Sequence, residues 1–162
     1  MIHIIDAREK DIPLINDLAI KTWPSTFKNI LCKEQIAYML EWMYSYSSLS
    51  KQMQKGHHFL LVKAADQNCG YCSYVNKTKK TILQKIYILP ESQGLGIGKS
   101  LLKEVILRAR QSGKKTLQLN VNRYNKAVNF YQKQGFKIIS TEDNPIGQGY
   151  YMNDFVMELP LS

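Results

Sequence analysis

The stretch with the clearest chemical character lies between residues 93 and 100 and reads Gln-Gly-Leu-Gly-Ile-Gly-Lys-Ser. Its glycines alternate with other residues, so the backbone can turn tightly and approach a ligand without obstruction by a Cβ atom. A strand-like segment precedes the stretch, and a segment with helical periodicity follows it. Unpaired N–H groups at the start of a helix attract phosphate, because they lie at the positive end of the helix dipole. The stretch therefore predicts an anion-binding cradle.

Two known nucleotide-binding motifs do not fit this stretch. A P-loop requires a glycine separated by four residues from its Gly-Lys-Ser ending, and Gln93 occupies that position. The dinucleotide fingerprint requires glycines at its first, third and sixth positions, and counting from Gly94 the sixth position is Lys99. The pattern that does fit is Gln-x-x-Gly-x-Gly, formed by Gln93, Gly96 and Gly98.

A second chemical candidate is the phenol of Tyr131, in the segment Asn-Lys-Ala-Val-Asn-Phe-Tyr-Gln-Lys-Gln-Gly-Phe at residues 125–136. A phenol has a pKa of about 10, so it stays protonated at neutral pH and can donate a proton to a leaving group. The competing interpretation is that Tyr131 and Phe130 only fill the core from the apolar face of a helix. Without a match to a known motif, the residue and its helix face favour the core interpretation.

Together the two segments resemble the GNAT superfamily of N-acetyltransferases. Residues 93–98 match its Arg/Gln-x-x-Gly-x-Gly/Ala loop, and residues 125–136 are similar to its Asn-x-x-Ala-x-x-Phe-Tyr-x-x-x-Gly-Phe block. The resemblance implies an acetyl-coenzyme A-dependent enzyme, in which the loop holds the pyrophosphate and Tyr131 is the general acid for the departing thiolate. Replacing Gly96 or Gly98 by alanine is then expected to weaken cofactor binding without destabilising the helix.

The resemblance also implies that the strand Ile86 to Ile88 separates from its neighbour. Its backbone groups would bind pantetheine, and the N–H of Ile88 would face the oxyanion. One spacing departs from the family pattern, because Asn125 stands two residues before Ala127 rather than three, so Asn122 is the alternative contact to pantetheine. The catalytic groups expected are Tyr131 and Ile88, and the cofactor-binding residues expected are Ile86, Tyr87, Ile88, Gln93, Gly94, Leu95, Gly96, Ile97, Gly98, Lys99, Ser100, Asn122, Asn125, Tyr131 and Lys133.

The base that takes the proton of the amine is left open. Many relatives carry a glutamate on the strand before the loop, but the corresponding residue here is Gln84, whose amide accepts no proton at neutral pH. The alternatives are Glu41 or Asp154 acting through water, or direct loss of the proton to solvent.

The acceptor is expected to be an amine, and a fainter resemblance indicates which kind. Residues 21–28, the Tyr-Met-Leu-Glu helix at 38–41 and residues 154–158 are similar to bacterial polyamine N-acetyltransferases, which acetylate spermidine or spermine. A cationic acceptor requires carboxylates nearby. The acceptor-binding residues expected are Trp23, Phe27, Glu41 and Asp154. An alternative is that residues 23–27 only close the hydrophobic core, and a second alternative is an acceptor amine on a peptide or protein.

The positive charge of the chain is concentrated in one region. The net charge is +9, and between residues 92 and 141 ten Lys/Arg stand against a single acid, Glu104. A polyanionic cofactor bound there explains this excess, since clustered positive charge concentrates anions. Nucleic acid would explain it too, although it is the less favoured partner. A domain that binds coenzyme A or RNA without catalysis is therefore the alternative function.

The composition indicates one globular domain spanning residues 1–162. No signal peptide or long apolar run is present, so we expect a cytoplasmic protein with no membrane partner. Its three cysteines are expected to be reduced thiols, with Cys69 and Cys72 on opposite faces of a strand. His57 and His58 have no third ligand, so no metal is expected. A homodimer is one option for its assembly.

Periodicity and turn residues predict the elements that position these side chains. Strands are expected at 2–5, 59–62, 71–75, 83–89, 116–121, 137–141 and 151–159, and helices after Asp11, across 33–46, from the glycine stretch to Gly113, and within 122–134. Turn formers at 66–70 and 143–147 indicate connections between strands. This order predicts an α/β protein with a mixed, mostly antiparallel twisted central sheet of about six to seven strands and about four helices, which is the GNAT fold.

Overall fold

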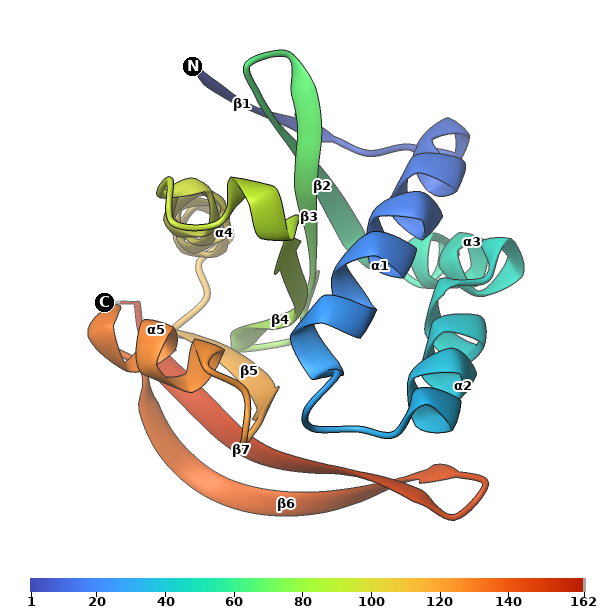
Figure 1. Ribbon diagram of the computed structural model, residues 1–162. Helices are drawn as coiled ribbons and strands as arrows, with labels where there is room; N and C mark the ends of the chain where they lie inside the picture. The colour runs from blue at the N-terminus through green and yellow to red at the C-terminus, as the bar shows by residue number, and fades with distance from the viewer. Residues whose placement is uncertain (162) are drawn as a thin grey trace.

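The computed structural model describes residues 1–161, which form one seven-stranded sheet with helices on both faces (Figure 1). The strands are β1 (Ile2–Asp6), β2 (His58–Ala64), β3 (Gln67–Asn76), β4 (Lys80–Ile88), β5 (Thr116–Asn122), β6 (Lys137–Gly147) and β7 (Tyr150–Pro160). The helices are α1 (Ile12–Phe27), α2 (Lys33–Tyr44), α3 (Tyr46–Gln54), α4 (Ile97–Gln111) and α5 (Ala127–Lys133), with short 3-10 turns η1 (Glu9–Asp11) and η2 (Pro90–Ser92). The predicted fold class is confirmed.

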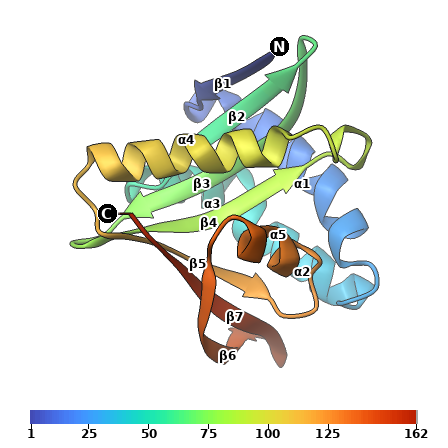
Figure 2. The same cartoon turned by 90° about the vertical axis from the view of Figure 1, so that its left-hand side faces the viewer.

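The strand order is β1-β2-β3-β4-β5-β7-β6, and every neighbouring pair is antiparallel except β4 with β5. Two parallel strands need a long crossover connection, and α4 provides it (Figure 2). The helix predicted across residues 33–46 is confirmed as α2, which ends two residues earlier, and α3 is a further helix that the sequence pattern did not predict. Ser45 leaves the helical conformation with ψ 154°, and its Oγ accepts a hydrogen bond from the N–H of Ser48 at 3.2 Å. Ser45 thereby ends α2 and caps α3.

The two faces of the sheet carry separate hydrophobic cores. On the α4 face, α4 lies across β2 to β4 and α5 lies beside β5 (Figure 2), and Leu101 and Val105 are fully buried. On the α1 face, α1, α2 and α3 bury an aromatic core that includes Trp23, Tyr44 and Tyr71. Of the helices within residues 1–161, none combines the length and apolar character that crossing a lipid bilayer requires.

The parallel pairing of β4 with β5 is short. It runs only from Lys80 with Thr116 to Leu83 with Leu119, although both strands continue beyond these residues. In β4 the register with β3 also shifts, which leaves Gln84 as the extra residue of a β-bulge. A bulge bends its strand, so β4 turns away from β5. The separation predicted for this strand pair is therefore present, and it creates a gap between residues 84–88 and 120–122.

A second bulge, in β3, makes the prediction for the cysteines wrong. Gly70 pairs with Val62 while Asn68 pairs with the next residue of β2, so Cys69 is the extra residue. The alternation of side chains therefore shifts by one position, and Cys69 and Cys72 both lie in the core of the α4 face.

Two hairpins are tighter than the sequence predicts. Ala65 and Asp66, with φ of 51° and 63°, form the turn between β2 and β3, so most of the turn predicted at 66–70 is strand. β6 continues to Gly147, and a tight turn at Gln148 and Gly149 joins it to β7. The resulting long hairpin reaches toward α2 (Figure 1).

Candidate active site

The gap between β4 and β5 leads into a cavity of about 340 Å³. Strands β4 and β5 and helix α5 line the cavity at the gap, whereas α1, α2 and the β6–β7 hairpin line it on the α1 face. The predicted site residues that the fold brings together in its walls are Trp23, Phe27, Ile86, Tyr87, Asn122, Asn125, Tyr131 and Asp154. The predicted residues Glu41 and Lys133 are exposed and lie outside this lining.

The glycine-rich stretch forms a cradle of unpaired amides beside the gap. Within residues 1–161, no N–H group from residue 94 to residue 99 donates a hydrogen bond. Gly94 and Gly96 have φ of 80° and 79°, which L side chains rarely adopt. Gln93 ties the cradle to β4, because its Nε2 donates to the carbonyl of Ile88 at 3.1 Å. This row of free donors at a helix start fits an anion such as a pyrophosphate.

The expectation that an alanine leaves the helix stable is wrong at Gly96. With φ of +79°, an alanine there would adopt a left-handed conformation that costs about 1–2 kcal/mol. Gly98 lies inside α4 without a positive φ, and an added Cβ would stand 3.8 Å from Ile88 Cγ1, an ordinary contact. For Gly98 the expectation stays a prediction.

The backbone of β4 offers hydrogen-bonding groups to the gap. Leu89 donates its N–H to the carbonyl of Cys69 in β3 at 2.8 Å. Because successive residues of a strand direct their N–H and C=O groups to opposite sides, those of Ile88 and Ile86 point away from β3 and toward the gap. The backbone of Tyr87 faces β3 instead, and its side chain belongs to the aromatic core of the α1 face.

The ring of Tyr131 packs in the core, and its hydroxyl is left without a hydrogen-bond partner among residues 1–161. The residue is 5% exposed, and its ring packs edge-on against Phe130 and Phe136, with centroids 5.3 and 5.6 Å apart. Within the described chain the hydroxyl makes no hydrogen bond, yet it is not among the fully buried unpaired atoms. Burial raises the pKa of the Tyr131 phenol well above its ordinary value, so the phenol is protonated.

Asn122 and Asn125 shape the connection between β5 and α5. The Oδ1 of Asn122 accepts from the N–H of Tyr124, and the Oδ1 of Asn125 accepts from the N–H of Ala127, both at 2.9 Å. Each side-chain oxygen is therefore used in a local turn. Both residues line the cavity, and each keeps an Nδ2 group that can donate to a ligand.

The aromatic residues of α1 line the cavity and also close the core. The Trp23 ring lies 4.5 Å from the Phe27 ring and 5.6 Å from the Tyr87 ring, measured between centroids. Its Nε1 donates to the hydroxyl of Tyr44 at 3.2 Å. Both Trp23 and Phe27 are only 2% exposed, so the two interpretations of residues 23–27 are combined in one structure.

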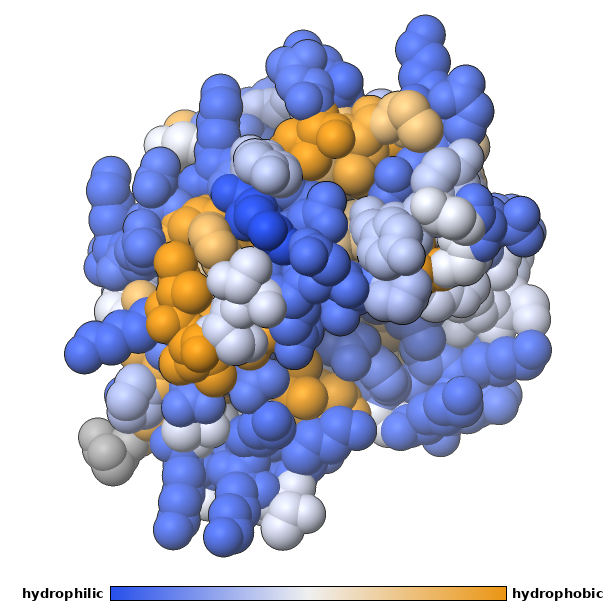
Figure 3. Space-filling model, turned by 90° about the horizontal axis from the view of Figure 1, so that it is seen from below, coloured by the Kyte–Doolittle hydropathy of each residue, from blue (hydrophilic) through white to orange (hydrophobic). Residues whose placement is uncertain are grey.

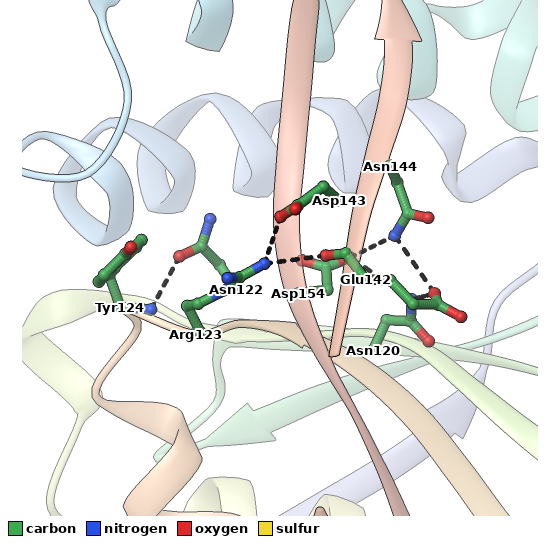
Figure 4. Close-up of polar contacts among 8 residues, drawn as sticks. All are labelled: Asn120, Asn122, Arg123, Tyr124, Glu142, Asp143, Asn144 and Asp154. Carbon is green, nitrogen blue, oxygen red and sulfur yellow. Dashed lines mark hydrogen bonds and ion pairs between the residues drawn. The ribbon is translucent and has the colours of Figure 1, made fainter. Parts of the chain in front are cut away.

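Asp154 is the carboxylate in the cavity wall, and it is 7% exposed. Figure 4 shows its polar contacts. Its Oδ2 accepts from Asn144 Nδ2 at 3.2 Å and from Asn120 Nδ2 at 3.4 Å. Within residues 1–161, Oδ1 has no hydrogen-bond donor, and Asp154 forms no ion pair. Burial, and secondarily Glu142 on β6, raise the pKa of this carboxyl above its usual value, while the two amides and Arg123 oppose that shift.

A buried lysine in the cavity wall escapes the sequence prediction. Lys85 is 8% exposed, and its Nζ donates to Gln52 Oε1 in α3 at 2.9 Å. The ammonium lies 5.7 Å from the ring centroids of both Tyr44 and Phe59, within cation–π range. Burial lowers its pKa to about 8. The one available signal was a lysine within an apolar strand, and solvent exposure is the usual explanation of that pattern.

Part of the basic segment is paired within the fold. Arg108 in α4 bonds to Asp6 in β1 at 2.6 Å, and Arg123 pairs with Asp143 (Figure 4). Lys99, in the first turn of α4, is exposed beside the cradle. Some of the charge excess is thus structural, and some is free to attract an anion.

Solved structures of N-acetyltransferases share this fold. The structure of a GCN5-related N-acetyltransferase from Rhodopseudomonas palustris superposes with a TM-score of 0.84 over 98% of this chain and 95% of that one, at 13% identity. The PaiA N-acetyltransferase from Thermoplasma acidophilum, solved in complex with coenzyme A, also gives a TM-score of 0.84, with 26% identity and 99% coverage of both chains.

Sequence comparison then identifies the family. The model described as "Acetyltransferase (GNAT) domain" matches residues 28–158, so the chain belongs to the GNAT family, as its motifs predict. The [ribosomal protein bS18]-alanine N-acetyltransferase of Haemophilus influenzae is 31% identical over 73% of this chain and 80% of that protein. The spermidine N(1)-acetyltransferase of Thermoplasma acidophilum is 26% identical over 92% and 91%. The protein is an N-acetyltransferase that uses acetyl-coenzyme A.

Proposed function

We propose that this enzyme acetylates a primary amine of a small cationic acceptor of the polyamine type, with Tyr131 as the proton donor. The observation that carries the proposal is the state of Asp154, a buried carboxylate with a free oxygen and no cationic partner within residues 1–161. A buried charge without a partner is costly, and an ammonium of the acceptor would supply that partner. One of the relatives is named as a spermidine N(1)-acetyltransferase.

The buried lysine of the cavity is compatible with a cationic acceptor. The ammonium of Lys85 is directed toward Gln52 in α3, whereas Asp154 stands on β7. Its pKa of about 8 also makes it less firmly charged than an exposed lysine. Asp154 therefore provides the negative end of the cavity, and the aromatic rings of α1 provide walls that can pack on methylene groups.

The acceptor side favours a slender molecule over an extended polypeptide. The hydroxyl of Tyr38 in α2 donates to the carbonyl of Ile146 at 2.6 Å, and Gln35 Nε2 donates to the carbonyl of Tyr151 at 2.9 Å. These two bonds, which we call the α2 latch, join α2 to both strands of the β6–β7 hairpin. On the face seen from below, hydrophobic side chains form separate groups between hydrophilic ones rather than one broad apolar surface (Figure 3).

The proposed role of Tyr131 follows from its burial. Bound acetyl-coenzyme A supplies the thioester whose acetyl group is transferred. The N–H of Ile88 points into the gap and can stabilise negative charge on the carbonyl oxygen. Tyr131 gives its proton to the sulfur that leaves. Because burial makes a free tyrosinate costly, its proton must be replaced in the same step, and the acceptor nitrogen, which becomes an amide, supplies it.

An acceptor panel tests this proposal. The purified protein is incubated with acetyl-coenzyme A and with spermidine, spermine, a monoamine or a peptide with a free N-terminus, and thiol release is measured. We expect kcat/KM to be highest for the polyamines and to be weakest for the peptide. Acetylation of the peptide alone would instead favour the acceptor class named for the Haemophilus influenzae relative, and would overturn the polyamine proposal.

A further inference from the structure

The transfer reaction releases one proton that Tyr131 does not carry away. A primary amine has a pKa of about 10.4, so the acceptor enters mostly as an ammonium. Its nitrogen loses two protons in total while one C–N bond forms and one C–S bond breaks. One proton ends on the thiol of coenzyme A, and the other is released to solvent. The group that takes the released proton must be a base at neutral pH and must face the cavity.

Few side chains in the cavity wall meet this requirement. Gln84 occupies the bulge of β4 at the gap, but an amide accepts no proton at neutral pH. Burial raises the pKa values of the Tyr87 and Tyr131 phenols, so both are protonated. Lys85 is protonated at neutral pH, because its lowered pKa is still about 8. Among the residues that the structure places in this wall, Asp154 is the carboxylate.

We propose that Asp154 takes this proton from the acceptor ammonium, directly or through one water molecule, and passes it to solvent. Its Oδ2 is held by the amides of Asn120 and Asn144, and its Oδ1 has no donor within residues 1–161. One oxygen therefore fixes the carboxylate, and the other is left to accept a proton. The inference rests on the proposed function, because it needs an amine that reaches Asp154.

The surroundings of Asp154 suit a proton acceptor. Glu142, directly opposite on β6, and burial both favour the protonated form and make the carboxylate a stronger base. The charge of Arg123 and the two amides favour the ionised form. Tyr87 on β4 is electrostatically coupled to Asp154, since Asp154 contributes to the raised pKa of its phenol. Lys85 lines the same cavity and is bonded to α3.

The test compares Asp154→Asn with the wild type across pH, with spermidine as acceptor. Asparagine keeps the shape and removes the base. We expect kcat to fall about 10²- to 10⁴-fold at neutral pH and to recover roughly tenfold per pH unit as more of the amine loses its proton to solvent. If Asp154 only binds the ammonium, the KM rises instead and the pH profile of kcat keeps its shape, which would overturn the inference.

A matched control and a second variant complete this test. Glu158→Gln removes a carboxylate from the same strand, β7, that lies outside the cavity wall and away from the two amides that hold Asp154, so kcat should stay within about threefold. Asn144→Ala removes one donor to Asp154 and should move the acidic limb of the kcat profile to higher pH. An unmoved limb would contradict the inference. An inactive wild type would instead contradict the polyamine proposal itself.

Discussion

The proposed cofactor side and the proposed acceptor side of this active site are built in different ways. The cradle is one contiguous stretch, residues 93–100, whose glycine spacing and helix start fix its shape. The acceptor side is assembled from α1, α2, β4, β5 and β7, so that Trp23 and Asp154, near opposite ends of the chain, share one cavity. Local geometry thus sets the glycine motif that the chain shares with its family, and long-range packing sets the shape of the proposed acceptor site.

Tyr131 lies where the two sides meet, and removal of its hydroxyl should have the largest effect on kcat. We expect Tyr131→Phe to keep the ring packing and to lower kcat about 10²- to 10⁴-fold, because only the proton donor is removed. The measurement is kcat from pH 6 to pH 10, with coenzyme A affinity as a second readout. Tyr124→Phe is the control, since Tyr124 is 67% exposed. A Tyr131→Phe variant with full kcat would show that the phenol is only a core residue.

The acceptor side also contains the buried ammonium of Lys85, which should lower the unfolding free energy of the protein. The pKa of Lys85 is about 8 in the folded protein and 10.5 for the unperturbed group, so below pH 8 the fold must hold a costly ammonium. Between pH 8 and about 10.5 the folded state loses this proton before the unfolded state does. The unfolding free energy should therefore rise with pH in that window.

Replacing Lys85 by methionine should remove this cost. We expect Lys85→Met to raise the unfolding free energy at pH 7 by up to roughly 3 kcal/mol and to flatten its pH dependence between pH 8 and 10. Urea unfolding at several pH values measures both effects. Lys103→Met, on the exposed face of α4, is the control and should change stability by less than about 0.5 kcal/mol. A destabilised Lys85→Met variant would show that the bond to Gln52 outweighs the burial cost.

The contrast between local geometry and long-range packing also explains which features the sequence could predict. The succession of strands and helices along the chain, the α4 crossover and the glycine-rich stretch follow from local patterns, namely alternation, helical periodicity and glycine spacing. The two β-bulges do not. Residues 69–75 of β3 are buried on both faces of the sheet, so the one-residue shift in alternation that a bulge causes cannot be recognised there. Those bulges move Cys69 to the α4 face and place Gln84 at the gap. The sequence therefore predicts which residues form these strands better than it predicts the face of the sheet on which each side chain lies.

The acceptor wall was predictable only in part. Trp23, Phe27 and Asp154 line the cavity, whereas Glu41 is exposed on α2. Which turn of a helix faces a distant hairpin depends on contacts such as the bond between Tyr38 and Ile146, and these have no local signature. The same holds for a buried lysine, whose partners come from α2, α3 and β2.

The cofactor side can be probed without disturbing the acceptor side. We expect Gly98→Ala to weaken coenzyme A binding about tenfold, because its Cβ narrows the cradle, while thermal stability is kept or rises slightly. Isothermal titration and thermal unfolding measure the two effects. Equal affinity in the variant and the wild type would contradict the cradle.

Gly96 and Gly113 separate backbone strain from cofactor binding. Both have positive φ, 79° at the start of α4 and 73° just after its end. Alanine at either position should lower the unfolding free energy by about 1–2 kcal/mol. Only Gly96→Ala should also weaken coenzyme A binding, since Gly113 lies at the opposite end of the helix. A similar loss of affinity in both variants would mean that strain alone accounts for the Gly96 effect.

The α2 latch offers the reverse experiment, in which the acceptor side changes and the cofactor side does not. Tyr38→Phe removes the hydrogen bond to Ile146, worth about 1 kcal/mol, so the KM for spermidine should rise about fivefold while coenzyme A affinity stays the same. Tyr46→Phe, at an exposed tyrosine of α3, is the control.

Gly147→Ala should act more strongly on the same latch, because an added Cβ would stand 2.6 Å from the Tyr38 hydroxyl. If α2 and the hairpin define the width of the acceptor site, either change should also let bulkier amines compete better with spermidine. An unchanged acceptor ranking in both variants would mean that Asp154 and the aromatic wall select the amine without help from α2.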